Sequence, residues 1–354
     1  MVLEQMLKKA VEKGASDIFV VAGLPISFKI EGEILPQEEE RMMPADTERL
    51  MREVYTAASG RDFDLLWNRG DDDFSFSVRE IGRFRVNAYR QRGSLAAVIR
   101  VVLFDLPDSA SLGIPDVVME LSRKTKGMVL VTGPAGSGKS TTLSCLVDRI
   151  NTTRNCHVLT LEDPIEYLHR HKKSIVSQRE ITVDTQSYSQ ALRSALRQSP
   201  DVILIGEMRD QDTIEIAMTA AETGHLVLST LHTVGAANTI DRIIDAFPPE
   251  QQHQARIQLS MVLQAVVSQQ LIPSSAGGQI PAFEIMTATP AIRSMIRDAK
   301  IHQIDSVIYS SAEQGMRTMD SDLLRLHREG LVGEEDALLY SVNQEMMMRN
   351  LSRR

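Results

Sequence analysis

The chain has 354 residues, of which 43% are hydrophobic and 24% charged, so it has the composition of an ordinary globular protein and a length that predicts about two domains. Its formal net charge of −8 argues against a general nucleic-acid or anionic-lipid binder, because such proteins usually carry a basic excess. No apolar run approaches the roughly 18 residues of a membrane-spanning helix, and no signal-peptide core is present, so a cytoplasmic protein without a transmembrane segment is expected. The two cysteines, Cys145 and Cys156, exclude a four-cysteine zinc site.

Residues 1–104 predict a small α+β domain. Helical periodicity, short β-rich runs and Gly/Pro turn signals alternate along this part of the chain. The expected elements are a helix over residues 3–13, strands over 18–21 and 26–30, a hairpin turn at Glu31–Gly32, a helix within 44–55 and a half-buried strand around 74–78.

A strand that carries arginines comes next. In the segment RFRVNAY, residues 83–89, alternation places the apolar side chains on one face and Arg83 and Arg85 on the other. Arg100 stands within a further apolar strand, residues 95–103. From the pattern alone, the simplest interpretation is that these arginines are solvated at the surface of a sheet.

Residues 105–115 are rich in Pro, Ser and Gly and predict a linker before a second domain, residues 116–354. Short strands then alternate with helical stretches, as in a parallel sheet covered by helices on both faces. The expected strands are residues 129–131, 158–161, 202–205 and 226–228. From about Pro249 the chain is expected to be mostly helical, with a frayed end over 346–354. The predicted fold class is α/β, with a smaller α+β domain in front.

The segment GPAGSGKS matches the P-loop pattern G-x-x-x-x-G-K-[ST] at every position. It follows an apolar strand and precedes a predicted helix, which is the context that the motif requires. The glycines let backbone N–H groups point at phosphate oxygens, the helix N-terminus adds partial positive charge, and the lysine reaches the β- and γ-phosphates. The predicted nucleotide-binding residues are Gly133, Pro134, Ala135, Gly136, Ser137, Gly138, Lys139, Ser140, Thr141 and Thr142.

Two acidic side chains at the ends of predicted strands are candidates for catalysis beside Lys139. Glu207 follows the strand 202–205 where a Walker B carboxylate belongs, and it either holds Mg²⁺ through water, together with the Ser140 hydroxyl, or orients the attacking water. Glu162 ends another strand and is a second candidate for positioning this water. A single acid in such a place would usually cap the next helix. Because no Asn-Lys-x-Asp stretch that reads guanine is present, ATP is favoured over GTP.

His225 and His232 flank the predicted strand 226–231. A histidine there is either a structural residue or, beside a nucleotide, a sensor of the γ-phosphate. The spacing favours neither interpretation, so both residues are kept among the candidate catalytic residues.

Four segments in this order resemble the boxes of the secretion ATPases of type II secretion and type IV pili. They are GPAGSGKSTT (133–142), LTLEDPIEY (159–167), IGEMRD (205–210) and TGHLVLSTLHT (223–233). Within that superfamily, RFRVN (83–87), SQRE (177–180), ALRSALR (191–197) and AIRSMIRD (291–298) are similar to segments of the pilus retraction motors.

The resemblance implies a PAS-like N-terminal domain, a RecA-like ATPase domain and a homohexamer in which nucleotide lies between the domains and neighbouring subunits complete each site. Arg83, Arg85 and Arg100 then become candidates to neutralise phosphate charge, and an arginine finger supplies about 10³–10⁵ in rate. The resemblance further implies a Mg²⁺- and ATP-dependent motor at the inner face of the cytoplasmic membrane. It would turn an inner-membrane platform protein and retract the pilus during twitching motility, without binding nucleic acid.

The sequence departs from the family pattern at several positions. Ala135 replaces a usual threonine, the segment ASDIFV (15–20) lacks a typical histidine, and Ser294 and Met295 replace Asn and Leu, while Arg293 and Arg297 remain. The alternatives are a retraction accessory paralogue, a pilus or secretion assembly ATPase and a non-hydrolysing nucleotide-dependent regulator. A RecA-like DNA motor is disfavoured by the acidic charge.

Overall fold

The computed structural model describes residues 3–30, 32–102 and 106–352. The chain divides into two compact units, Met1–Asp105 together with Pro164–Leu168, and Leu106–Asp163 together with His169–Arg354. Glu31 of the predicted hairpin turn, residue 103 of the predicted third strand and residue 105 of the predicted linker lie outside the described residues. The boundaries 1–104, 105–115 and 116–354 therefore remain a prediction from the sequence.

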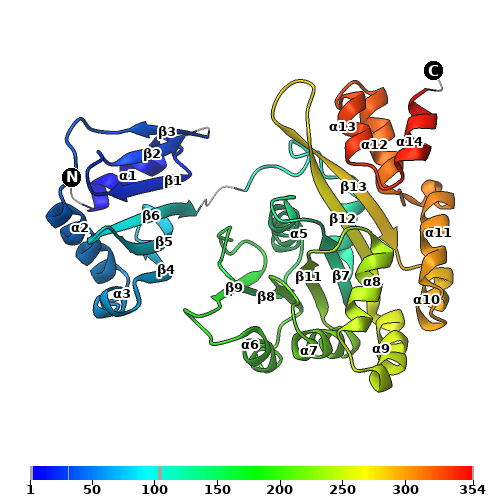
Figure 1. Ribbon diagram of the computed structural model, residues 1–354. Helices are drawn as coiled ribbons and strands as arrows, with labels where there is room; N and C mark the ends of the chain where they lie inside the picture. The colour runs from blue at the N-terminus through cyan, green and yellow to red at the C-terminus, as the bar shows by residue number, and fades with distance from the viewer. Residues whose placement is uncertain (1–2, 31, 103–105, 353–354) are drawn as a thin grey trace. The chain divides into compact units, whose positions relative to one another are not determined.

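The first unit is a six-stranded antiparallel sheet in the order β3-β2-β1-β6-β5-β4, packed with three helices (Figure 1). Helix α2 packs on β6, and α3 packs on β4 and β5. Fully buried Phe28, Tyr55 and Phe84 belong to its hydrophobic core. The elements are α1 (Leu3–Glu12), β1 (Asp17–Val21), β2 (Ser27–Ile30), β3 (Glu33–Pro36), α2 (Pro44–Ala57), α3 (Asp64–Arg69), β4 (Asp71–Val78), β5 (Gly82–Gln91) and β6 (Ser94–Val102).

The alternation predicted for residues 83–89 is confirmed. On β5, Phe84, Val86 and Ala88 are completely buried, and the residues between them are more exposed. Arg85 lies directly opposite Arg100 across the β5–β6 ladder. Because directly opposed residues of an antiparallel pair share a face, the two arginines stand on the same side of the sheet.

The second unit contains a seven-stranded sheet in the order β13-β12-β7-β11-β10-β8-β9 (Figure 1). Among the described strands of this sheet, every neighbouring pair is parallel except β12 and β13, which are antiparallel. Its elements up to the last strand are α4 (Asp116–Met119), β7 (Gly127–Thr132), α5 (Lys139–Thr153), β8 (His157–Glu162), β9 (Ile175–Glu180), α6 (Tyr188–Ala195), β10 (Val202–Ile205), α7 (Gln211–Glu222), β11 (Leu226–Leu231), α8 (Ala236–Asp245), α9 (Pro249–Val262), β12 (Leu263–Pro273) and β13 (Gln279–Thr287). The helices that follow are α10 (Pro290–Arg297), α11 (Ile304–Ser310), α12 (Met319–Arg328), α13 (Glu334–Leu339) and α14 (Gln344–Leu351).

Both faces of this sheet are buried, which explains why its strands are continuous apolar runs. On β7, Met128 and Leu130 pack into a core cluster with α6, α7, α8 and α9, whereas Val129 and Val131 pack on the other face with α4 and α5. The predicted α/β class is confirmed, and the four predicted strands lie within β7, β8, β10 and β11. No helix in the described part of the chain has the length and hydropathy that a bilayer span requires.

The helical C-terminal part expected from about Pro249 is confirmed by α9–α14, but two unpredicted strands, β12 and β13, lie within it. One expectation for this part of the chain needs correction. The segment expected to be frayed forms α14 up to Leu351, which is anchored by buried Met347 in a cluster with α12. Residues 353–354 lie outside the described residues.

Candidate nucleotide-binding site

The P-loop connects β7 to α5 at the carboxyl edge of the parallel sheet. Its central turn requires glycine, because Gly136 and Gly138 adopt φ angles of 77° and 85°, in the left-handed region that other residues rarely enter. Gly138 is also the N-cap of α5. The first turn of this 15-residue helix therefore presents its free N–H groups at the end of the loop, as anion binding requires.

The side chains of the loop are arranged for a polyphosphate. Lys139 is only 7% exposed, and its Nζ donates hydrogen bonds to the carbonyl oxygens of Gly133 (2.9 Å) and Pro134 (2.7 Å), so its ammonium group is held inside the loop. The buried hydroxyl of Ser137 has no hydrogen-bond partner within the described residues. A buried donor of this kind costs free energy until an acceptor arrives. A phosphate oxygen is an acceptor that fits this position.

Three more predicted residues meet at the same edge of the sheet because β8, β10 and β11 are adjacent and parallel. Glu162 ends β8, Glu207 follows β10 after one glycine, and His232 directly follows β11. Cross-strand hydrogen bonds fix these strand ends, since Gly206 N–H donates to the Leu161 carbonyl (2.7 Å) and Thr230 Oγ1 donates to the Gly206 carbonyl (2.6 Å).

The side chains of Arg209 and His232 lie beside the carboxylate of Glu207. Arg209 forms an ion pair with its Oε1, and His232 Nε2 lies 3.3 Å from its Oε2. The Glu207 side chain is 11% exposed, whereas Arg209 and His232 are 71% and 58% exposed. Arg209 was missed in the sequence analysis, although it stands in the IGEMRD segment two residues after the predicted Walker B acid.

Hydrogen bonds hold Glu162 in place at the end of β8. Its Oε1 accepts from Thr160 Oγ1 (2.6 Å) and from Gln178 Nε2 (3.3 Å), and the Gln178 Oε1 accepts from the His169 N–H (2.8 Å). Gln178 lies on β9, the neighbouring parallel strand. The SQRE segment therefore contributes a side chain that orients this carboxylate, which the sequence alone did not indicate.

Tyr188, at the start of α6, brings a phenol hydroxyl between the ends of β8 and β10. A Cβ atom added to Gly206 would lie 2.8 Å from its Oη and 3.4 Å from the Glu162 Cα, so only glycine fits at position 206 without a shift. Burial, then the negative charges of Asp163, Glu207 and Glu162, raise the pKa of Tyr188. The hydroxyl therefore stays protonated beside the carboxylates.

The two candidate histidines lie at opposite ends of β11. His225 precedes the strand, and its Nδ1 lies 2.9 Å from the Ala220 carbonyl oxygen, at the amino edge of the sheet. The structure thus brings His232, but not His225, to the carboxylates. The geometry of a single chain does not support a catalytic role for His225.

A pocket of about 550 Å³ opens beside the P-loop. Gly138, Thr141 and Thr142 form one wall, residues 110–114 form another, and Gln269 and Leu271 of β12 lie among the remaining lining residues. The Thr142 hydroxyl, however, donates to Gln269 Oε1 (2.7 Å). Thr142 therefore contacts β12 rather than presenting a free hydroxyl to a ligand.

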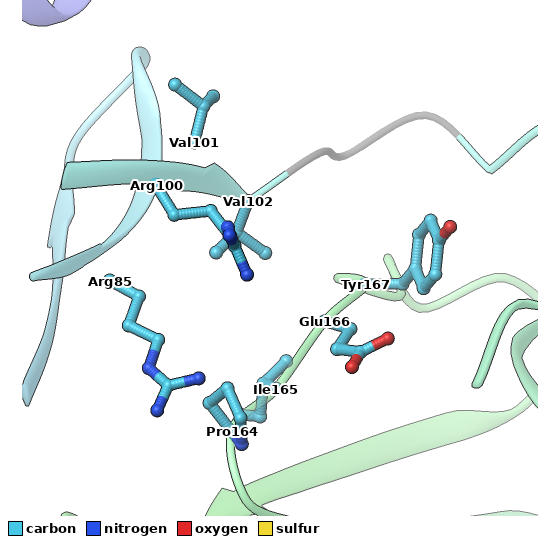
Figure 2. A pocket seen from close by; sticks show the side chains of 8 residues that line it. All are labelled: Arg85, Arg100, Val101, Val102, Pro164, Ile165, Glu166 and Tyr167. Atoms are coloured by element: carbon cyan, nitrogen blue, oxygen red, sulfur yellow. The ribbon is translucent and has the colours of Figure 1, made fainter. Parts of the chain in front are cut away.

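The candidate arginines belong to the first unit. Arg85 forms a bidentate pair with Asp73 (3.1 and 2.7 Å), and Arg100 Nε lies 2.9 Å from Asp17 Oδ1. Figure 2 shows Arg85 and Arg100 extending toward a pocket of about 250 Å³ that Pro164–Tyr167, assigned to the same unit, also lines. Arg83, like Arg85 and Arg100, belongs to the first unit, whereas the P-loop belongs to the second. A nucleotide site shared by these arginines and the P-loop therefore remains a prediction.

Comparison with known proteins places these features in a family. The family model for type II/IV secretion system proteins matches residues 1–298. The type IV pilus retraction ATPase PilT of Pseudomonas aeruginosa is 45% identical over 95% of this chain and 96% of its own length. The type IV pilus ATPase PilU of the same species is 38% identical over 96% of this chain and 89% of its own length.

A solved structure gives the same result for the fold. The crystal structure of the pilus retraction motor PilT with bound ADP matches with a TM-score of 0.91 and 46% identity, and the match covers 99% of both chains. The likeness therefore extends over both units of the chain and does not stop at the P-loop segment.

Proposed function

The chain belongs to the family of type II/IV secretion system proteins, and we propose from this premise that it is an ATP-hydrolysing motor that powers retraction of type IV pili. The hydrolytic part of the proposal is carried by one observation. The P-loop, Glu207, Glu162 and His232 lie at the carboxyl ends of four adjacent parallel strands, where ligands bind in open α/β sheets. The retraction part rests on the full-length likeness to PilT.

In the proposed site the backbone N–H groups of the P-loop and the Lys139 ammonium bind the phosphates. Phosphate oxygens replace the Gly133 and Pro134 carbonyls as the acceptors of Lys139, and Ser137 gains the acceptor that it lacks. Thr141 lines the adjoining pocket of about 550 Å³, where it contacts the nucleotide and where the nucleoside lies. This assignment leaves the γ-phosphate pointing toward the carboxylates of the neighbouring strands.

We assign different roles to the two carboxylates on the basis of the strand order. Strand β11 lies next to β7, β10 is the second strand along and β8 the third, at roughly 4.8 Å per step. Glu207 is therefore the nearer carboxylate to the P-loop. We assign Glu207 to the attacking water and to the metal shell, and Glu162 to orienting the water network from farther away.

The donor atoms at this edge suit Mg²⁺. The Ser140 hydroxyl and the Glu207 carboxylate are hard oxygen ligands, and Mg²⁺ is usually bound by one or two such groups together with substrate phosphates rather than by a protein cage. Within the described residues, no group of three or more His, Cys, Asp or Glu side chains could hold a metal ion. When bound, Mg²⁺ neutralises charge that develops on the transferred phosphoryl group.

The motor would work as a homohexamer in the cytoplasm, peripherally at the inner face of the cytoplasmic membrane. Arg83, Arg85 and Arg100 would neutralise phosphate charge from the first unit of the same or a neighbouring subunit, so that rotation between units controls hydrolysis. The force would act on an inner-membrane platform protein, and the net charge of −8 argues against a general affinity for nucleic acid.

Two measurements test this proposal. The purified protein should release phosphate from ATP only with Mg²⁺, and Lys139→Ala should abolish both nucleotide binding and turnover. Absence of turnover in the parent protein would favour a nucleotide-dependent regulator. A deletion strain should carry excess pili, whereas loss of pili would indicate an assembly ATPase.

A second candidate role is that of a retraction accessory paralogue, because PilU is also similar over nearly the whole chain. If the chain is the principal motor, its deletion alone abolishes retraction. If it is an accessory, retraction persists until a second ATPase is removed as well.

A further inference from the structure

We propose that Gln269, in the middle of β12, is a positioning residue that fixes the P-loop for nucleotide binding. This inference rests on the proposed function, because it assumes that the loop binds ATP. No motif in the sequence indicated Gln269, and β12 itself was not predicted.

Gln269 reaches the P-loop because β12 pairs with β7 in parallel. Ser268 lies opposite Thr132, the last residue of β7, so Gln269 comes level with Gly133, the first residue of the loop. Only 3% of Gln269 is exposed. Its side chain is thus ordered by burial rather than free to move in solvent.

Gln269 touches the loop at three places. Its backbone carbonyl lies so close to Gly133 that a Cβ atom there would collide with it. A Cβ atom added to Gly138 would lie only 2.8 Å from the Gln269 Nε2. The Gln269 Oε1 accepts the hydrogen bond of 2.7 Å from Thr142, in the first turn of α5. The start of the loop, its end and the helix behind it are thus connected through one residue.

These contacts explain two of the loop glycines without reference to a ligand. Gly133 must lack a side chain because the β12 backbone occupies the space behind it, and at Gly138 the Gln269 side-chain amide leaves little room for one. The close approach also means that any shift of Gln269 moves the backbone N–H groups that would bind phosphate. A bound polyphosphate depends on several such groups at once, so a small loss of order weakens binding strongly.

The neutral amide at position 269 has a second consequence. A carboxylate of the same size could still accept the Thr142 hydrogen bond, but it would bring a negative charge beside the loop that receives phosphate. Gln269→Glu should therefore weaken nucleotide binding by charge, and protonation of that carboxyl at lower pH should restore part of the affinity. Such a pH dependence of ADP affinity is expected only if the side chain at position 269 lies close to the bound phosphates.

The test uses the full-length protein and two readouts that do not require turnover. Fluorescence titration with N-methylanthraniloyl-ADP measures affinity, and hydrogen exchange of the backbone amides of residues 133–140 measures the order of the loop without nucleotide. Gln269→Leu and Thr142→Val should each weaken ADP binding about tenfold and speed the exchange. The double variant should lose no more than either single one, since both remove the same hydrogen bond.

Gln270→Leu is the matched control, because the adjacent side chain of a strand points to the opposite face. It should retain the parental affinity and exchange. An equal loss in Gln270→Leu, or parental affinity in Gln269→Leu, would overturn the inference. Should Gln269→Leu not fold, Thr142→Val removes the same hydrogen bond without altering β12, and parental behaviour there would be equally decisive.

Lys139→Ala separates this inference from the function on which it rests. If Lys139→Ala loses ADP binding while the Gln269 and Thr142 variants keep it, the positioning role is wrong and the ATPase proposal stands. If Lys139→Ala keeps ADP binding, the ATPase proposal itself fails.

Discussion

Replacing Glu207 with glutamine should reduce ATP turnover far more than it reduces stability. The substitution keeps the shape of the side chain that meets Arg209 and His232, but it removes the negative charge. If Glu207 activates the attacking water, the loss of this charge lowers turnover by about 10²–10⁴-fold. That loss corresponds to about 3–5 kcal/mol of activation free energy.

The exposed partners of Glu207 limit the cost to folding. Arg209 and His232 are 71% and 58% exposed, so solvent screens both interactions, and pairs of this kind contribute at most about 1 kcal/mol to the free energy of unfolding. For a domain of this size, such a change lowers Tm by about 2–4 °C. The predicted effects on chemistry and on stability therefore differ by several kcal/mol.

Phosphate release at saturating Mg²⁺ and ATP measures the first quantity, and thermal unfolding of the same samples measures the second. Titration with fluorescent ADP should show that Glu207→Gln still binds nucleotide. Glu48→Gln, which alters a surface pair of 2.7 Å with Arg52 on α2, is the control and should match the parent in turnover. Parental turnover in Glu207→Gln, or a loss explained by unfolded protein, would refute the reasoning.

Three further predictions concern the second unit. Gly206→Ala should lower ATP turnover at least about tenfold, because the added Cβ atom would lie 2.8 Å from Tyr188 Oη and force a shift. A phosphate-release assay measures this effect, and parental turnover would contradict the prediction. Burial lowers the pKa of His169 to about 4, so the free energy of unfolding should fall by up to about 3 kcal/mol as the pH drops from 6.5 to 4. Urea unfolding measured across this pH range should show a smaller fall in His169→Gln than in the parent protein. Asp322→Ala should destabilise by about 3–5 kcal/mol, because this buried carboxylate pairs with two arginines and accepts from the Phe283 N–H; thermal unfolding checks this, with Glu329→Gln as the exposed control.

The sequence predicted best those features that local chemistry determines. The P-loop is recognisable because its glycines and lysine have spacings that few other structures require, and the buried parallel strands are recognisable because both of their faces contact helices. The arginine strand was also predictable from local sequence, because the alternating burial of Phe84, Val86 and Ala88 is a property of a single strand.

Features that depend on contacts between distant segments were not predictable. Nothing near Gln269 in the sequence indicates Thr142, from which it is separated by 127 positions, and the link exists only because β12 pairs with β7. Likewise, Gln178 reaches Glu162 only because β9 lies beside β8. Such residues carry ordinary polar side chains in ordinary strands, so neither composition nor periodicity distinguishes them.

The order of the strands is the clearest example of this limit. Along the chain, Glu162 ends β8, the first strand after the P-loop, whereas Glu207 follows the later strand β10. In the sheet, β11 and β10 are inserted between β7 and β8, and this insertion brings His232 and Glu207 nearer to the loop. The same insertion makes β10 and β11 neighbours, which allows His232 to lie 3.3 Å from the Glu207 carboxylate. The division of roles proposed for the two acids therefore rests on the strand order, to which residues along the whole sheet contribute.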